Sequence, residues 1–352
     1  MRSPFPCAPA SSPDARRPSI VHLVEPKDSE THVKVFAGAV RAGLLATPRT
    51  LPWTYFYDET GSRLFDAICQ LPEYYLTRTE DSILRQYASD MVADLPRDPG
   101  TELTLIELGS GSALKTQRLI GAALNHHGRL HYVPIDVSPS ALEESALRLT
   151  RKFRGLRVSG YVADYFRGLE RIMARAWGPR LIVFLGSSVG NYGMDSATEL
   201  LAMISRTMRA DDRLLLGTDM AKEPSVLEAA YDDAQGVTAA FNRNLLHRIN
   251  RELGADFPVD AFEHRATYRP DRGRVEMHLV CTRDQTVRIP AADLILRFAA
   301  GETIHTENSH KYTFEILTRL KESAGFIDEA AWTDERGWFR LQRWRPGDVP
   351  AA

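Results

Sequence analysis

One segment, residues 103–115, constrains the fold more than any other part of the chain. Its sequence, LTLIELGSGSALK, places a strand-forming run before a Gly-Ser-Gly turn and the start of a helix. Gly109 and Gly111 let the backbone approach a ligand closely, and the helix offers unpaired N–H groups. A second strand, residues 130–135, ends beside Asp136, whose carboxylate suits the two hydroxyls of a ribose. The pattern predicts two βα units that hold half of a nucleotide-like cofactor.

The details of the turn favour S-adenosylmethionine over a dinucleotide. Leu114 stands where G-x-G-x-x-G requires its third glycine, and Asp136 follows Gly109 by 27 residues instead of about 20. No Gly-Lys-Ser/Thr follows the turn at the spacing of a P-loop. Glu107 adds a carboxylate that would repel a diphosphate but suits the amino group of a methionine-type cofactor. From these residues alone, an ordinary βα corner with a solvated acid remains the alternative.

Composition excludes several classes of partner. With 44 Lys and Arg against 46 Asp and Glu, the net charge is −2, so no overall field recruits nucleic acid or an anionic membrane. Cys7, Cys69 and Cys281 lie far apart without a C-x-x-C pair, and no histidines have metal-ligand spacing. No apolar run is long enough to span a bilayer. We therefore expect a cytoplasmic protein without a metal and with a small-molecule substrate, and, lacking a heptad seam, a monomer.

Periodicity divides the chain into an extension and two domains. Residues 1–30 are rich in Pro, Ser and Arg and are expected to be a disordered extension. The first domain is predicted over 31–219 and 312–352, with a helical cap at its start, and the second over 220–311. Five strand-like runs separated mostly by helical segments predict a doubly wound parallel sheet: 103–108, 130–135, 157–163, 181–185 and 213–218. The second domain is predicted to contain a helix and three antiparallel strands: 225–253, 267–272, 274–282 and 286–289. A helix over 313–324 and the aromatic-rich residues 332–344 are expected to close the first sheet.

Six separated motifs carry a resemblance to a known family. They are YFYD at 55–58, LPEYY at 71–75, ELGSG at 107–111, IDVS at 135–138, GSSVGN at 186–191 and ENS at 307–309. Over roughly residues 34–350 the chain resembles the histidine Nα-methyltransferases. That family uses S-adenosylmethionine to convert L-histidine into its trimethylated betaine, hercynine, in the ergothioneine pathway. The resemblance implies a class I methyltransferase, an α/β Rossmann-like doubly wound sheet with an inserted α+β substrate-binding domain.

The resemblance also implies which residues hold the cofactor. It places Gly109 and Lys115 at the methionine part, Asp136 on the ribose, and Asp164 with Tyr165 around the adenine. Lys115 would neutralise the cofactor carboxylate, and Asp164 would accept from the exocyclic amine. Tyr165 departs from the phenylalanine expected there, which retains the ring and adds a hydroxyl.

For the substrate, the resemblance places Asn191 and Tyr231 on the carboxylate and α-amino group of histidine. Tyr57 would lie close to the methylated nitrogen, accepting its proton or orienting its lone pair, and is the candidate catalytic residue. Glu307 and Ser309 would hydrogen-bond the two imidazole nitrogens.

Three further side chains complete the implied site. Tyr74 and Met277 would form an apolar wall around the ring, and Phe65 would pack near the reacting centre; each read singly is an ordinary core residue. The alternatives are methylation of another aromatic amino acid or a histidine derivative, a cofactor-binding module without activity, and a nicotinamide-dependent oxidoreductase. Indole fits poorly, because it offers one N–H donor and no acceptor to two polar groups.

Overall fold

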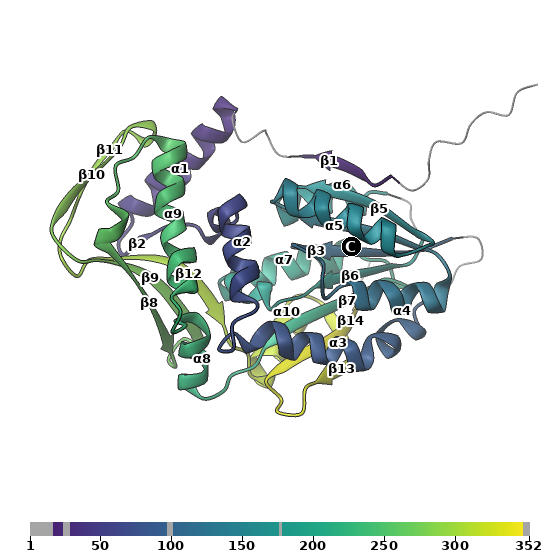
Figure 1. Ribbon diagram of the computed structural model, residues 1–352. Coiled ribbons are helices and arrows are strands. Elements are labelled where there is room, and N and C mark those ends of the chain that lie inside the picture. Colours follow the sequence, from purple (N-terminus) through teal and green to yellow (C-terminus); the bar gives the residue numbers. More distant parts are fainter. Residues whose placement is uncertain (1–16, 24–28, 97–100, 176–177, 348–352) are drawn as a thin grey trace, which may run out of the picture.

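The protein consists of two lobes, and the chain passes between them several times (Figure 1). The computed structural model describes residues 17–23, 29–96, 101–175 and 178–347. One lobe is built on an eight-stranded sheet and the other on a four-stranded sheet with an added hairpin. Within the described ranges, no helix has both the length and the apolar character needed to cross a bilayer.

The larger sheet has the strand order β1-β5-β4-β3-β6-β7-β14-β13. Its strands are β1 (Ser19–His22), β3 (Leu103–Leu108), β4 (Leu130–Asp136), β5 (Leu156–Val162), β6 (Arg180–Phe184), β7 (Arg213–Asp219), β13 (Phe326–Thr333) and β14 (Phe339–Pro346). Every neighbouring pair is parallel except those that involve β14, which runs antiparallel to both β7 and β13. The five predicted central strands are confirmed, and every residue of β3 and β4 is buried, as expected for strands covered on both faces.

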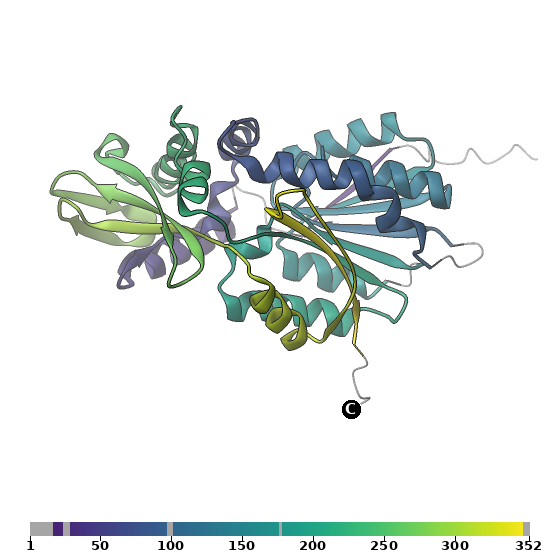
Figure 2. The same ribbon diagram turned by 90° about the horizontal axis from the view of Figure 1, so that it is seen from below.

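Helices cover both faces of this sheet, as Figure 2 shows from below. One layer contains α3 (Tyr75–Ala93), α4 (Gln117–His127) and α5 (Pro139–Lys152). The other contains α6 (Tyr165–Met173), α7 (Met194–Thr207) and α10 (Phe314–Ser323). Each layer shares a buried apolar cluster with one face of the sheet, so the doubly wound prediction is confirmed.

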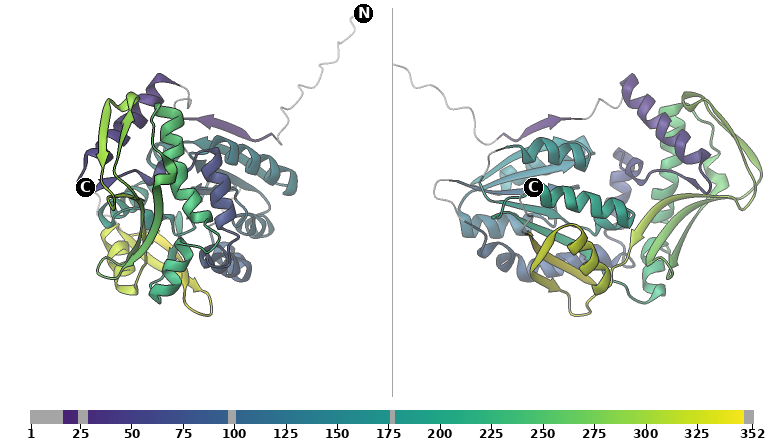
Figure 3. Two further views of the ribbon diagram at one scale, coloured as in Figure 1. Left: turned by 60° about the vertical axis from the view of Figure 1, so that its left-hand side comes forward. Right: turned by 180° about the vertical axis from the view of Figure 1, so that it is seen from behind.

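The prediction that residues 1–30 form a disordered extension is wrong for residues 19–22. Ser19–His22 form β1, which lies parallel to β5 along residues 159–162 at the outer edge of the sheet (Figure 3). Backbone hydrogen bonding to an exposed sheet edge needs little apolar burial, so composition did not reveal it. Residues 1–16 and 24–28 of that prediction lie outside the described residues.

The second lobe contains a sheet of order β2-β12-β9-β8 and the hairpin β10-β11. Its elements are β2 (Arg49–Thr50), β8 (Phe262–Arg269), β9 (Arg274–Cys281), β10 (Gln285–Ile289), β11 (Leu294–Phe298), β12 (Thr303–His310), α1 (Glu30–Leu45), α2 (Glu59–Ile68), α8 (Pro224–Tyr231) and α9 (Val237–Leu253). The single helix predicted over 225–253 is instead α8 and α9. Gly236 adopts a left-handed φ of 72°, and the Asp233 carboxylate accepts from the amides of Val237 at 3.0 Å and Thr238 at 2.7 Å, which starts a new helix.

The predicted helical cap does not belong wholly to the first domain. Phe36 and Leu44 of α1 and Ile68 of α2 share one apolar cluster with Leu246 of α9, whereas α3 packs on the large sheet. β2 also joins the small sheet by pairing with β12. Helical periodicity reports that a face is apolar but not what covers it, so the sequence could not assign these helices to a lobe.

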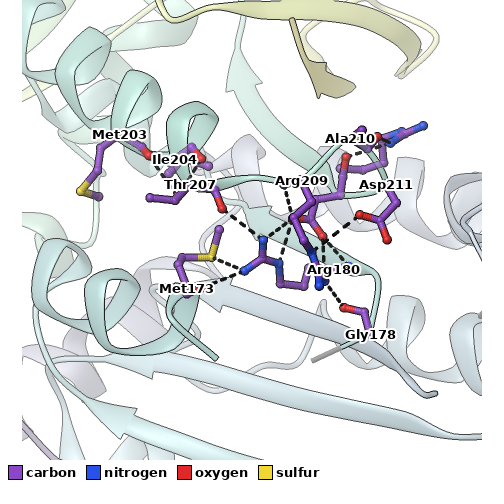
Figure 4. A network of polar contacts seen from close by, with 11 residues as sticks. Met173, Gly178, Arg180, Met203, Ile204, Thr207, Arg209, Ala210 and Asp211 are labelled. Atoms are coloured by element: carbon purple, nitrogen blue, oxygen red, sulfur yellow. Dashed lines mark hydrogen bonds and ion pairs between the residues drawn. The ribbon is translucent and has the colours of Figure 1, made fainter. Parts of the chain in front are cut away.

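A buried ion pair links the amino-terminal ends of β6 and β7 (Figure 4). Arg180 opens β6, and its Nε donates to Asp212, just before β7, at 2.8 Å. The same carboxylate accepts the backbone N–H groups of Arg180 at 3.0 Å and Arg209 at 2.7 Å. The side chains of Arg180 and Asp212 are 2% and 0% exposed, and Arg209, whose Nη2 lies 3.6 Å from Asp212 Oδ1, supplies a second cation to the same carboxylate.

Candidate active site

A pocket opens at the carboxyl ends of β3 and β4, where an α/β sheet binds its ligands. Gly109, directly after β3, has a φ of +70°, and a Cβ built there would lie 2.4 Å from Tyr165 Oη. Glycine is therefore required both by the backbone and by the space. Asp136 ends β4, and its carboxylate accepts from Gly111 N at 2.7 Å and Ser138 N at 2.8 Å. A carboxylate has about four acceptor sites, so this one retains capacity for a diol.

The lining of this first pocket matches the expected cofactor set in large part. Gly109, Asp136, Asp164 and Tyr165 all line it. Asp164 begins α6 as its N-cap, accepting from Arg167 N at 2.9 Å, and its side chain is half exposed. The Tyr165 ring meets Phe184 edge to face at 5.3 Å. The whole lining is Trp53, Thr54, Tyr57, Ser62, Phe65, Asp66, Gly109, Gly111, Ser112, Asp136, Val137, Ser138, Ala141, Asp164, Tyr165, Ser188, Asn191 and Tyr192.

Two of the expected cofactor residues lie away from the lining of this pocket. Lys115 forms an ion pair with the buried Glu80, whose other oxygen accepts the N–H of Gly186 at 2.8 Å. The Glu107 carboxylate accepts from Thr116 and Tyr132, one hydroxyl on each oxygen.

The Glu107 carboxyl is buried, and its predicted role stays a prediction. Burial raises the pKa of this carboxyl to about 7. Its oxygens accept internal hydrogen bonds and its side chain does not line the cofactor pocket, so these contacts add no support to the prediction that Glu107 faces the cofactor amino group.

A second pocket lies between the lobes. Its lining contains every residue predicted to bind substrate: Tyr57, Phe65, Tyr74, Asn191, Tyr231, Met277, Glu307 and Ser309. Tyr57, Phe65, Ser188 and Asn191 line both pockets, so they mark the place where the two meet. A group transferred from one ligand to the other would cross at this junction.

A β-bulge places the polar pair on the pocket side of β12. The register shifts between His305 and Glu307, so His305 opposes His278 while Glu307 opposes Met277. Because neighbouring residues of β9 point to opposite faces, the bulge separates His305 from Glu307 despite their even spacing. Glu307 and Ser309 then both line the substrate pocket.

Burial dominates the electrostatics of the substrate pocket. It raises the pKa of Glu307 to about 7, although Lys311 and a hydrogen bond from Asn191 act to lower it. Burial also raises the pKa of Tyr57 well above the 10.0 of a free phenol, and the negative charge of Glu307 adds to the effect. Tyr57 therefore remains a neutral phenol at physiological pH, which favours orientation of the lone pair over acceptance of the proton.

Several lining residues were not predicted. Trp53 and Tyr192 meet edge to face at 5.4 Å in the cofactor pocket, and Phe241 lies beside Tyr57 in the substrate pocket. Behind the pocket lie Asp219 and Lys311. The sequence contained a signal for each of these two residues. Asp219 ends a predicted parallel strand, and Lys311 continues the every-second-residue spacing of Glu307 and Ser309.

The strand order, the glycine turn after β3 and the carboxylate after β4 define a class I methyltransferase that uses S-adenosylmethionine. The chain belongs to the family described as histidine-specific, S-adenosylmethionine-dependent methyltransferases, whose model matches residues 36–346. This confirms the family resemblance, the fold class and the cofactor.

Two curated relatives agree with this assignment. The histidine N-alpha-methyltransferase of Mycolicibacterium smegmatis is 43% identical over 86% of this chain and 92% of its own length. Ergothioneine biosynthesis protein 1 of Schizosaccharomyces pombe is 29% identical over 78% of this chain and 36% of its own. The solved magnesium protoporphyrin IX methyltransferase of Synechocystis overlaps 82% of this chain and 95% of that chain, with 10% identity and a TM-score of 0.41.

The site also offers no obvious place for a metal. Across the ranges that the structure describes, no group of three or more His, Cys, Asp and Glu side chains is arranged to hold a metal ion.

Proposed function

We propose that the protein transfers methyl groups from S-adenosylmethionine to the α-amino nitrogen of L-histidine until it is trimethylated, giving hercynine for ergothioneine biosynthesis. One observation carries the proposal: a carboxylate and a hydroxyl, from Glu307 and Ser309, lie side by side in a pocket that meets the cofactor pocket. The family and its characterised relatives support the choice of histidine.

The cofactor pocket suits S-adenosylmethionine by its own geometry. Gly109 leaves open the volume that any side chain would fill, and Asp136 retains acceptor sites for the ribose. When bound, the cofactor supplies a sulfonium methyl group as the electrophile.

The junction residues are proposed to align the attacking amine. Tyr57 and Asn191 line both pockets, so they can hold the amine of the substrate at the boundary where the methyl group arrives. Phe65 meets the Tyr57 ring edge to face at 5.7 Å and excludes water from that boundary. In-line displacement depends mainly on such alignment, and no covalent intermediate is needed.

Repeated methylation requires a site that tolerates the loss of N–H donors. Each transfer replaces one N–H by a methyl group, and the amine must lose a proton before the next. The phenol of Tyr57 and the amide of Asn191 are neutral, so neither demands a fixed ion-pair partner on the nitrogen. A neutral junction can therefore accept the amine, its methylated forms and the final fixed cation.

The far end of the pocket is proposed to read the ring. Glu307 accepts an N–H and the hydroxyl of Ser309 donates to the other ring nitrogen, while Met277 and Tyr74 enclose the ring faces. An indole would leave one of these buried polar groups unpaired, which costs roughly 1–3 kcal/mol.

Mass spectrometry of products tests the proposal. The purified protein is incubated with S-adenosylmethionine and an equimolar mixture of the proteinogenic amino acids, and histidine with three added methyl groups is the expected product. Nα-acetylhistidine is the matched control, because it keeps the ring but has no free amine, and it should remain unmethylated. Methylation of a different amino acid, or of the acetylated control, would refute the proposed substrate or the proposed nitrogen.

We further propose that the protein acts as a monomer in the cytoplasm, without nucleic acid or membrane partners. The net charge of −2 supports the absence of nucleic-acid and membrane partners, the lack of a C-x-x-C pair fits a reducing compartment, and the lack of a heptad seam in the sequence supports a monomer. Light scattering after size-exclusion chromatography checks the oligomeric state, and a mass of twice 39.5 kDa would contradict the monomer.

A further inference from the structure

A fully buried lysine lies behind the polar wall of the substrate pocket. Lys311 follows β12 two residues after Ser309, and 0% of its side chain is exposed. Its ammonium donates to Tyr231 Oη and to Ser309 Oγ, each at 2.9 Å, and lies 2.7 Å from Asp219 Oδ2. An ammonium has three donors and no acceptor, so these contacts use it fully.

Asp219 keeps this lysine charged. Burial acts to lower the pKa of Lys311, but Asp219 and Tyr231 act to raise it, and the net shift is upward. Asp219 is itself held at the end of β7, where it accepts from Tyr75 Oη at 2.7 Å and pairs with Lys222. The cation is therefore a fixed feature of the wall, supported from the side away from the substrate.

The fixed cation restricts the two hydroxyls in front of it. Ser309 Oγ and Tyr231 Oη are 2.7 Å apart, so one of them donates to the other. Both already accept from Lys311, which cannot accept in return. Of the two hydroxyl protons, one is used inside the pair, and the other is left to point into the pocket.

We propose that Lys311, held by Asp219, is a positioning residue that makes the Ser309–Tyr231 pair a hydrogen-bond donor to the substrate ring. The pocket then presents one donor from this pair and one acceptor from Glu307, and that combination matches a neutral imidazole in a single tautomer. An imidazolium ring has two donors, so one N–H would face a donating hydroxyl. This inference rests on the proposed function, because it takes the ring of histidine as the ligand.

Ring analogues test the inference on the unaltered protein. We would measure the affinities of histidine and 2-fluorohistidine by calorimetry in the presence of S-adenosylhomocysteine, from about pH 8 to about pH 5.5. The fluorinated ring stays neutral throughout, whereas a histidine ring with a pKa near 6.5 becomes about nine-tenths protonated. The affinity for histidine should fall about tenfold relative to the analogue.

The ratio of the two affinities removes the part of the protein's titration that is common to both ligands. The ionisable groups that line the pocket are Glu307 after the bulge of β12, Tyr57 and Tyr74 from the segments flanking α2, and Tyr231 of α8, with Lys311 behind them. Glu307, whose pKa is raised to about 7, titrates within this range and contacts the ring, so the ratio is also measured in Glu307→Gln, where that titration is absent. A ratio that does not change with pH overturns the inference. Histidine that binds with the expected ratio but is not methylated would refute only the proposed function, and methylation with a constant ratio would refute only the inference.

Two matched variants distinguish the effect of Lys311 on the two hydroxyls from a general effect of losing a cation beside Asp219. Lys311→Met removes the cation behind the hydroxyls, and Lys222→Met removes the other cation on Asp219 without touching them. Lys311→Met should weaken histidine binding by about 10- to 100-fold. It should change the binding of thienylalanine, whose ring has neither an N–H nor a ring nitrogen, by less than about threefold.

The control should leave both ligands within about threefold of the unaltered protein. Retained binding of S-adenosylhomocysteine shows that a variant is folded. Equal losses for both ligands in Lys311→Met, or the same loss of selectivity in Lys222→Met, overturn the inference. If Lys311→Met does not fold, the analogue ratio in the unaltered protein decides the question by itself.

Discussion

Substituting Gly109 by alanine should damage the cofactor site through two separable effects. The residue has a φ of +70°, which strains any side chain, and its new Cβ would lie 2.4 Å from Tyr165 Oη. The next atom of that ring, Cζ, is 3.4 Å away, at ordinary contact distance. Removing only the hydroxyl, by Tyr165→Phe, therefore removes the collision and leaves the backbone strain.

The two effects have different magnitudes. A left-handed alanine costs about 1–2 kcal/mol. The collision costs about 1–3 kcal/mol more, because the Tyr165 ring is packed against Phe184 and must shift. Because the free turn can relax out of this conformation and the bound turn cannot, Gly109→Ala should weaken cofactor binding by at most about 2–5 kcal/mol in total. Adding Tyr165→Phe should restore about 1–3 kcal/mol, or roughly 5- to 150-fold in affinity.

Calorimetric titration with S-adenosylhomocysteine measures these affinities. Gly111→Ala is the matched control, because Gly111 also has a positive φ, of +48°, but its Cβ would meet nothing within 4 Å. Tyr165→Phe should not rescue that variant. The reasoning is refuted if Tyr165→Phe fails to improve Gly109→Ala, or improves Gly111→Ala equally.

Three further predictions concern stability and the division of the site. Arg180→Met should lower the free energy of unfolding by about 1–3 kcal/mol, because the buried Asp212 loses the hydrogen bonds from the Arg180 guanidinium but keeps Arg209 and two backbone N–H donors; urea denaturation measures it, and no measurable loss contradicts it. The carboxyl of Glu307 has a pKa raised from 4.5 to about 7, so unfolding releases its proton and stability falls as pH rises through that interval. Glu307→Gln should therefore gain up to about 3 kcal/mol relative to the unaltered protein between about pH 4.5 and pH 7; thermal unfolding curves with no such divergence would count against this pKa. Glu307→Ala should weaken histidine binding far more than cofactor binding, and Asp136→Ala the reverse; equal losses in both titrations would contradict the proposed division.

Local patterns predicted most of the larger lobe. The strands β3 to β7 are short apolar runs between helical segments, and each such run can be read without knowing its neighbours. The break between α8 and α9 was missed, although Asp233 and Gly236 carry a helix start, because apolar periodicity continues across it. The edge strand β1 was missed because pairing along an edge leaves little apolar signal.

The sequence located the residues of the substrate pocket more completely than those of the cofactor pocket. All the substrate residues that the family resemblance implied line one pocket, and their contact with a ligand stays a prediction. Lys115 and Glu107 do not line the cofactor pocket: Lys115 pairs with Glu80, and Glu107 accepts from Thr116 and Tyr132, so their cofactor roles stay predictions. The sequence next to a glycine turn does not show which partners a carboxylate will have.

The sequence by itself determined the glycine turn, the carboxylate after β4 and the central parallel strands, because backbone conformation and strand alternation depend on residues close together in the chain. Only the tertiary structure decided which polar groups face the substrate. The bulge in β12 separates His305 from Glu307, and Lys311 meets Tyr231 across 80 residues and Asp219 across the boundary between the lobes. Such contacts depend on which surfaces are buried together, and burial is a property of the packed molecule that no local pattern contains.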